Sequence, residues 1–361
     1  MKIGILTYHR SHNYGALLQA IATRYILKNE GHDVYYVDYW PEYHRLRYTF
    51  FSFKKLYSKG LVHGVGYMKR FLGSCRTRWR KVCKSEAFIQ QYISPYTKQA
   101  SDTFDIIVYG SDQIWRKQDE LGDYNPIYFG KNNFNAPKHI AFSASMGGIP
   151  DSAADKDRIK NWIKTLNAIS VRESDLQSML QQMGLTEVYN TLDPTLLMSA
   201  SEWDEVLHLV GNEGLEKYAL YYKLLSNSFE MKQVKDFAKH YGLKLKILTG
   251  TGLYDENENF VKVTDPYDFV SLIRNASFVF TSSFHGLAFS IIYSRPFYAS
   301  FSKYPGRAES FLHTLGMKKC LLPPLGHIPS EFPLINYDLV YEKLARKQDD
   351  TLIFIRENIC C

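Results

Sequence analysis

The sequence has 361 residues and lacks long apolar runs. A membrane-spanning helix needs about 18 uninterrupted apolar residues, and no run approaches this length. The apolar stretch at residues 2–7 is also too short for a signal peptide, so we expect a protein that stays in the cytoplasm. Paired cysteines are lacking too. The five present are odd in number and have no metal-ligand spacing, which predicts free thiols in a reducing compartment. For Cys360 and Cys361 a plain exposed tail is favoured over lipidation.

Signs of disorder, internal repeats and low-complexity tracts are also missing. Apolar residues make up 45% of the chain and aromatic residues 15%, which is enough material for packed cores. Because single cores rarely grow this large, the length predicts two domains of roughly 150 residues each. The sequence contains no cluster of metal-ligand residues, so we predict neither a metal nor a cofactor.

Positive charge is concentrated in residues 41–84. This segment has twelve Lys or Arg residues and one acid, a net charge of +11, whereas the whole chain carries +7 and the remainder therefore −4. Aromatic residues are interleaved with the charge, the combination expected of a surface that docks on anionic lipid or on a lipid-linked diphosphate. No nucleic-acid motif accompanies it, so no nucleic-acid partner is predicted. The alternative is a solvated helical hairpin whose charges only keep it soluble.

Short apolar strands alternate with helical patterns along the chain, which predicts an α/β fold with parallel sheets. The expected strands cover residues 3–6, 34–37, 105–109, 139–143, 169–171 and 188–192, then 218–224, 243–248, 278–281 and 297–300. The pattern predicts a first domain at 1–198 with a basic, aromatic, helical insertion at about 41–100, a second domain at 199–335, and a C-terminal helix at 336–361.

Residues 281–290 lie where an expected strand passes into a helix, and free backbone N–H groups and the helix dipole make such a junction an anion site. Ser282 and Ser283 can donate hydrogen bonds to a phosphate, and Gly286 lets the backbone approach closely. His285 can both give and take a proton near pH 7. The alternative for His285 is a packed histidine that caps the helix.

Polar side chains also follow two strands of the expected first sheet, those at 3–6 and 105–109, and should lie at its ligand edge. The loop after residues 3–6 contains Asn13 and Tyr14, but Gly15 lacks the further glycines of a dinucleotide fingerprint. Asn13 could bind substrate or cap a helix. Asp112, after residues 105–109, could accept a proton from a sugar hydroxyl or orient it, or it could be a helix N-cap.

Cationic side chains follow two further strands. Arg172, after residues 169–171, could hold a phosphate or carboxylate through two hydrogen bonds. Its alternative is an ion pair with Glu173 or Asp175. Lys303 and Arg307 follow residues 297–300 and could lean over the same anion as His285, or they could be surface residues.

Six short motifs occur along the chain in a fixed order. They are Asn13-Tyr14-Gly15 with Leu18-Gln19, Gly110-Ser111-Asp112-Gln113-Ile114-Trp115, Ser143-Ala144-Ser145 before Gly147, Ser170-Val171-Arg172-Glu173, Asp193-Pro194-Thr195 and Ser283-Phe284-His285-Gly286. With these motifs the chain resembles the polysaccharide pyruvyl transferase family from Ile3 to about Leu322. The resemblance implies an α/β fold of two Rossmann-like domains facing a cleft, similar to the GT-B glycosyltransferases, with the last helix crossing back to the first domain.

The resemblance also implies a reaction in surface or capsular polysaccharide synthesis. The enolpyruvyl group of the co-substrate phosphoenolpyruvate moves to two sugar hydroxyls, forming a pyruvate ketal and releasing phosphate. The implied acceptor is a lipid-diphosphate-linked saccharide, of galactose type because 4- and 6-hydroxyls can close a ketal ring. The implied roles follow. His285 and Asp112 are catalytic, Arg172, Ser282, Ser283, Gly286, Lys303 and Arg307 bind phosphoenolpyruvate, and Asn13, Tyr14 and Gln113 bind the acceptor.

One position departs from the family pattern, because some members carry arginine where this chain has Ser283. The phosphate charge is then left to Arg172, the helix end, and Lys303 or Arg307. Two other functions stay open. One is a GT-B glycosyltransferase that uses a sugar nucleotide, for which Tyr254, Asp255 and Glu256 are the nearest candidate ligands. The other is a non-catalytic saccharide-binding protein at the inner membrane face.

Overall fold

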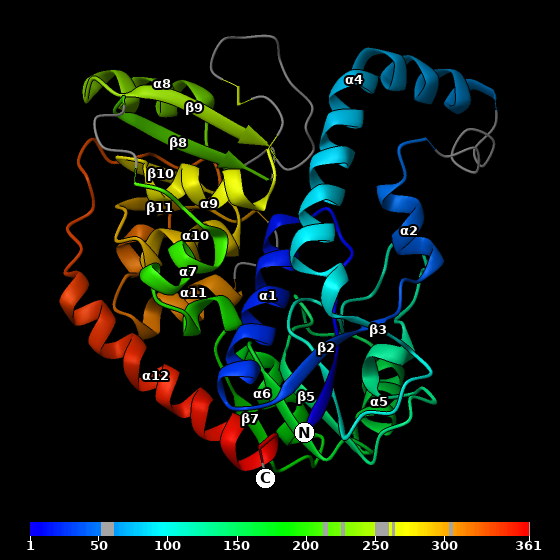
Figure 1. Cartoon of the computed structure of the whole chain (residues 1–361). Coiled ribbons are helices and arrows are strands. Elements are labelled where there is room, and N and C mark those ends of the chain that lie inside the picture. The colour runs from blue at the N-terminus through cyan, green and yellow to red at the C-terminus, as the bar shows by residue number, and fades with distance from the viewer. Residues whose placement is uncertain are drawn as a thin grey trace.

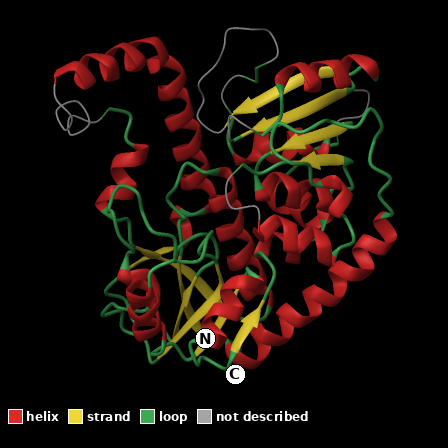
Figure 2. Ribbon diagram, turned by 180° about the vertical axis from the view of Figure 1, so that it is seen from behind, coloured by secondary structure: helices red, strands yellow, loops and turns green. Residues whose placement is uncertain are grey.

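The computed structural model describes residues 1–51, 61–211, 216–224, 228–249, 260–261, 264–302 and 306–360. Its strands form two parallel sheets, one in each half of the chain, as the alternating pattern predicts. Figure 1 and Figure 2 show the two sheets well separated, each with helices packed against it. The prediction of an α/β fold with two domains, each built on a parallel sheet, is confirmed.

The first sheet has seven strands in the order β3-β2-β1-β4-β5-β6-β7. They are β1 (Lys2–Leu6), β2 (Asp33–Asp38), β3 (Thr97–Gln99), β4 (Ile106–Tyr109), β5 (Lys138–Ala144), β6 (Ala168–Val171) and β7 (Val188–Asn190). The order reverses between β1 and β4, and ligands of such sheets bind in the crevice at this point. The edge strand β3 was not predicted, because its Thr-Lys-Gln sequence has no apolar pattern.

The second sheet has four strands in the order β11-β10-β8-β9. They are β8 (Tyr218–Lys223), β9 (Lys244–Thr249), β10 (Phe278–Thr281) and β11 (Phe297–Ala299). Every residue of β10 is buried, since helices and loops cover both faces of a parallel sheet.

Helices cover both sheets. In the first domain they are α1 (Tyr14–Asn29), α5 (Ala153–Ile163) and α6 (Ser174–Gln182); in the second they are α7 (Ala200–Leu207), α8 (Met231–His240), α9 (Pro266–Arg274), α10 (Phe284–Ile292) and α11 (Gly306–Thr314). All nine residues of α10 are buried, so this apolar helix lies in the core and fixes the position of His285.

The last helix, α12 (Tyr337–Asn358), leaves the second domain and returns to the first, as predicted (Figure 1). The Thr351 hydroxyl accepts a hydrogen bond from the Leu192 N–H at 3.1 Å. The Phe354 ring stacks on Phe142 of β5 at 6.2 Å between centroids. Nearer its start, the Tyr341 hydroxyl donates to the Ile291 carbonyl of α10 at 3.0 Å, so α12 contacts both domains.

The basic segment forms α2 (Glu42–Tyr48) and α4 (Leu61–Tyr92), and α4 extends well beyond the first sheet in Figure 1. Its C-terminal end is anchored. Phe88 and Ile89 are buried, and the Lys84 ammonium contacts the Asp268 carboxylate of α9 at 2.6 Å. Farther out, Trp79 is 56% exposed. Within the described residues, no helix is both long and apolar enough to cross a membrane.

Candidate active site

The first turn of α1 is a contact between the two domains. The Tyr14 hydroxyl donates to the Thr264 carbonyl at 3.3 Å, and the ring stacks on Phe269 at 5.4 Å. Gly15 follows, and a Cβ at this position would lie only 2.0 Å from Nδ1 of His285. Only glycine therefore lets the histidine ring approach α1. Asn13 caps α1, accepting from the Ala16 N–H at 3.3 Å, which is the alternative that the sequence left open.

Three charged side chains meet where the domains face one another. Asp193, after β7, forms an ion pair with Nη1 of Arg172 through Oδ2, which also lies 3.3 Å from Nε2 of His285. The side chains are 2% exposed for Arg172, 0% for Asp193 and 9% for His285, so the contacts are largely desolvated. We call Arg172, Asp193 and His285 the interdomain charge cluster.

The Asp193 carboxyl is ionised in this setting. Burial by itself raises its pKa, but the charges of Arg172 and His285, together with hydrogen bonds, outweigh burial and hold the pKa well below its usual range. Its other oxygen, Oδ1, accepts from the Thr195 N–H at 2.9 Å and from the Thr195 hydroxyl at 2.7 Å. The carboxylate is thus held in one orientation toward the histidine.

This orientation determines which nitrogen of His285 is reactive. A carboxylate beside Nε2 favours the tautomer with its proton on Nε2, which leaves Nδ1 as the basic nitrogen. The carboxylate thus orients the ring, as the aspartate does in a Ser-His-Asp triad. Asp193 belongs to one of the six motifs, but no role was predicted for it; its place just after a predicted strand was the available signal.

Around His285, the start of α10 offers backbone donors. The first intrahelical hydrogen bond runs from the Leu287 N–H to the Ser283 carbonyl, so the helix itself supplies no acceptor for the N–H groups of His285 and Gly286. Gly286 is required here, because a Cβ would lie 2.1 Å from Oγ1 of Thr281. The Ser282 hydroxyl accepts from the Leu224 N–H at 2.9 Å and so also supports the loop after β8.

Arg172 forms an ion pair with Asp193. The predicted alternative was an ion pair with Glu173 or Asp175, so the partner was wrong. Its Nε donates to the Ser111 hydroxyl at 2.8 Å and to the Ser143 carbonyl at 3.1 Å. The guanidinium is therefore held on several sides and supplies charge from a fixed place.

Asp112 and Gln113 lie beside this arrangement, one and two residues after Ser111. Asp112 has a φ of 75°, and its carboxylate accepts from the Gln113 N–H at 2.8 Å. No helix begins there, so the N-cap alternative was wrong. Burial and, more weakly, the charge of Asp112 raise the pKa of Tyr8. Asp112 therefore lies near Tyr8. The Gln113 side chain packs at Gly147, where a Cβ would lie 2.8 Å from Nε2.

Several predicted residues are not placed. Lys303 lies outside the described residues, as do Tyr254, Asp255 and Glu256. Arg307 is in the first turn of α11, but only its backbone is described. Among the described residues, no three or more His, Cys, Asp or Glu side chains gather closely enough to hold a metal ion, and the expectation of a metal-free site stays a prediction.

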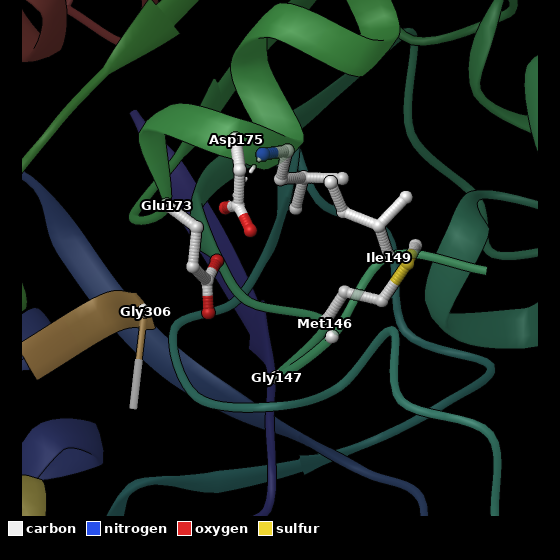
Figure 3. Close-up of a pocket in the computed structure, with 8 residues that line it drawn as sticks. Met146, Gly147, Ile149, Glu173, Asp175 and Gly306 are labelled. Carbon is white, nitrogen blue, oxygen red and sulfur yellow. Dashed lines mark hydrogen bonds between the residues drawn. The ribbon is translucent and has the colours of Figure 1, made fainter. Parts of the chain in front are cut away.

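Two small cavities lie at the cleft. One, of about 120 Å³, is lined by Arg172, Asp193 and Phe284, among others. The second, of about 160 Å³, is lined by the loop from Met146 to Ile149, by Glu173 and Asp175, and by Gly306 of the second domain (Figure 3).

The sequence model of the family described as polysaccharide pyruvyl transferase matches residues 13–300. No curated protein matches the sequence. Similar solved structures include a UDP-GlcNAc 2-epimerase from Methanocaldococcus jannaschii (TM-score 0.42, 8% identity, 96% of this chain and 92% of that chain). Two others are the heptosyltransferase WaaC from E. coli with ADP (0.40, 10%, 96% and 100%) and the glycosyltransferase SnogD from Streptomyces nogalater (0.40, 11%, 98% and 95%).

Proposed function

The chain belongs to the polysaccharide pyruvyl transferase family, and from that premise we propose that it transfers the enolpyruvyl group of phosphoenolpyruvate to two hydroxyls of a saccharide. The products are a pyruvate ketal and phosphate. The observation that carries this proposal is the contact of Asp193 with His285 at the start of α10, 3.3 Å between Oδ2 and Nε2. It supplies a proton-transfer group beside an anion site.

The reaction balances with acid–base catalysis alone. One hydroxyl oxygen bonds to C2 of phosphoenolpyruvate as C3 takes a proton; the bond from C2 to the phosphate oxygen then breaks, and the second hydroxyl oxygen bonds to C2. Of the two protons that the hydroxyls lose, one replaces the proton given to C3 and the other leaves on phosphate. We assign the proton donor for C3 to Nδ1 of His285 in its imidazolium form, with the Asp193 carboxylate beside Nε2; the neutral ring then accepts a hydroxyl proton.

Phosphoenolpyruvate is an anion, and its proposed partners are the N–H groups at the start of α10 and the field of Arg172. Ser282, Ser283, Lys303 and Arg307 remain predicted ligands. The proposed acceptor is a lipid-diphosphate-linked saccharide of galactose type in surface or capsular polysaccharide synthesis. Such an acceptor would place the enzyme in the cytoplasm at the inner membrane face, with α4 as the contact.

The first experiment is thermal unfolding of the wild type with phosphoenolpyruvate and, separately, with a panel of sugar nucleotides. A ligand at a hundred times its dissociation constant adds about 2.7 kcal/mol of stability, so a rise in the midpoint is easily resolved. We expect phosphoenolpyruvate to raise it. If only a sugar nucleotide does so, the proposal is wrong and the chain is a glycosyltransferase.

The second experiment follows phosphate release from phosphoenolpyruvate with methyl β-galactoside as acceptor. His285→Ala should lower turnover by about 10²-fold or more, because it removes the proton donor and acceptor. His313→Ala, which changes an exposed histidine of α11, is the matched control and should keep turnover. Equal turnover in the two variants would remove His285 from the mechanism.

A further inference from the structure

Arg172 and Glu173 are neighbours in sequence at the end of β6, but they serve different sides of the cleft. Successive side chains of an extended chain point to opposite faces. Arg172 contacts Asp193 in the interdomain charge cluster, whereas Glu173 lines the 160 Å³ cavity beside the Met146 to Ile149 loop. No role in binding was predicted for Glu173.

The Glu173 carboxyl group is buried with one oxygen unused. The residue is 5% exposed, and Oε1 accepts a hydrogen bond from the Ser145 hydroxyl. Oε2 has no hydrogen-bond partner among the described residues. A buried carboxylate oxygen without a partner costs free energy, so such an atom in a cavity calls for an external donor.

The cavity is large enough for more than a single water molecule. A single water needs only about 10–15 Å³ of such space, so a cavity of 160 Å³ holds several. In Figure 3 the carboxyl groups of Glu173 and Asp175 lie on the same side of the cavity, facing the Met146 to Ile149 loop. Gly306 of α11 closes it from the second domain, where a Cβ would lie 3.9 Å from Oδ2 of Asp175. The space therefore lies between the domains.

The charge of this wall determines which ligand fits. Two carboxylates repel the phosphate and carboxylate groups of phosphoenolpyruvate, but they accept hydrogen bonds from uncharged hydroxyl groups. The donor substrate is thus directed to the side of Arg172 and α10, and the cavity is left to a ligand that is rich in hydroxyls.

We infer that this cavity binds the acceptor saccharide through its hydroxyl groups, with Oε2 of Glu173 as the principal hydrogen-bond acceptor and Asp175 at the rim. The inference rests on the proposed function for the identity of the ligand as an acceptor. It adds Glu173 to the acceptor ligands that the resemblance implies, Asn13, Tyr14 and Gln113.

The test measures binding of methyl β-galactoside, and of the corresponding glucoside and mannoside, by calorimetry without phosphoenolpyruvate. Glu173→Gln keeps the shape and the acceptor for Ser145 but turns the free oxygen into an N–H donor. A hydrogen bond to a charged group predicts a loss of about 10- to 100-fold in affinity. Asp175→Asn should lose less, because Asp175 is exposed, and Glu187→Gln, an exposed control in the same domain, should lose nothing.

The outcomes separate this inference from the proposed function. If the wild type binds a glycoside and Glu173→Gln, with an unchanged melting temperature, binds it equally well, the inference is overturned. It is overturned as well if no glycoside of the panel binds, or if Mg²⁺ alone stabilises the wild type and not Glu173→Gln, which would indicate a cation site. If Glu173→Gln does not fold, the affinity of Asp175→Asn decides, and an unchanged value overturns the inference.

Turnover supplies the complementary readout. With phosphoenolpyruvate present, Glu173→Gln should raise KM for the glycoside and leave KM for phosphoenolpyruvate unchanged, whereas a purely structural role would move both. Should the wild type bind the glycoside through Glu173 but ignore phosphoenolpyruvate, the saccharide site stands and the proposed function fails.

Discussion

The interdomain charge cluster and the basic helix α4 both carry charge, but they hold it in opposite surroundings. In the cluster, the least buried side chain, His285, is 9% exposed, and Asp193 serves two partners. On α4, Arg76 and Arg80 are exposed, and the paired Lys84 is still 44% exposed. A buried charge depends on its partners, whereas an exposed charge is satisfied by water. Substitutions in the cluster should therefore lower the free energy of unfolding, whereas substitutions of the exposed charges on α4 should change it little.

The two regions come together at Lys81. Its ammonium lies 5.8 Å from the centroid of the Tyr14 ring, at the start of α1. Burial, and then the charge of Arg78, lowers the pKa of Lys81 to about 8. One lysine of α4 is thus drawn toward the cleft while its neighbours stay in solvent.

The largest effect should come from removing the shared carboxylate. Asp193→Asn leaves the charge of Arg172 buried without a counter-charge, which should cost about 3–5 kcal/mol of unfolding free energy. Turnover should fall by about 10²-fold or more, because Nε2 of His285 loses the group that fixes its tautomer. Urea unfolding measures the loss of unfolding free energy, and phosphate release measures the loss of turnover. Glu120→Gln breaks the half-exposed pair with Arg47 and should cost less than about 1 kcal/mol. Equal costs for both changes would refute the comparison.

The second effect concerns pH and two buried histidines of the first domain. Burial, first among the causes, lowers the pKa of His9 to about 4, and it does the same for His44. Below about pH 6.5 these two histidines take up protons in the unfolded chain but not in the folded chain. Their contribution to the free energy of unfolding is therefore fully present above that pH and is lost as the pH falls toward 4. Since a shift of one pKa unit corresponds to 1.36 kcal/mol, the loss of unfolding free energy is about 3 kcal/mol for each histidine.

Urea unfolding at pH 7.5 and 4.5 measures this slope. His9→Asn can still donate to the Thr7 carbonyl, which lies 3.0 Å from Nδ1 of His9, but it cannot be charged, so its stability should depend less on pH. The exposed control His313→Asn should keep the wild-type slope. An unchanged slope in His9→Asn would show that His9 titrates alike in both states.

A third, smaller effect is expected at Gly15. Alanine favours helices over glycine by about 1 kcal/mol, so Gly15→Ala should help α1 taken alone. The added Cβ would lie 2.0 Å from Nδ1 of His285, and overpacking of this kind costs about 1–3 kcal/mol. We expect a net loss of stability together with reduced turnover. Gly31→Ala, with nothing within 4 Å but a φ of 89°, controls for backbone effects without this contact and should keep turnover.

The smallest effect on stability should come from α4. Arg76→Gln with Arg80→Gln should change unfolding free energy by no more than about 0.5 kcal/mol. If α4 docks on membranes, the pair should bind vesicles containing phosphatidylserine about 30-fold more weakly, since each charge near such a surface contributes about 1 kcal/mol. Sedimentation with vesicles tests this, with Lys318→Gln and Lys319→Gln in the second domain as the control pair. Unchanged sedimentation would exclude docking through these residues.

Sequence patterns worked best where burial imposes them. The apolar strands β1 and β10 and the helix α12 were predicted because a strand or helix that faces a core must be apolar there. The strand β3 was missed because an edge strand of three residues buries little. Local partners were also misjudged. Glu173 and Asp175 were predicted as alternative ion-pair partners of Arg172. Successive side chains of an extended chain point to opposite sides, however, so Glu173 points away from Arg172.

The sequence by itself determined the two parallel sheets, the last helix and the positions of the motifs at strand ends, because periodicity and turn residues encode them locally. The return of that helix to the first domain was implied by the family resemblance. Only the tertiary structure decided that Asp193 faces both Arg172 and His285, that Gly15 makes room for the histidine ring, and that Glu173 keeps a free oxygen in a cavity. These relations join residues up to 270 positions apart, such as Gly15 and His285. They arise when the domains pack, and no local pattern specifies which side chains will then share one buried space.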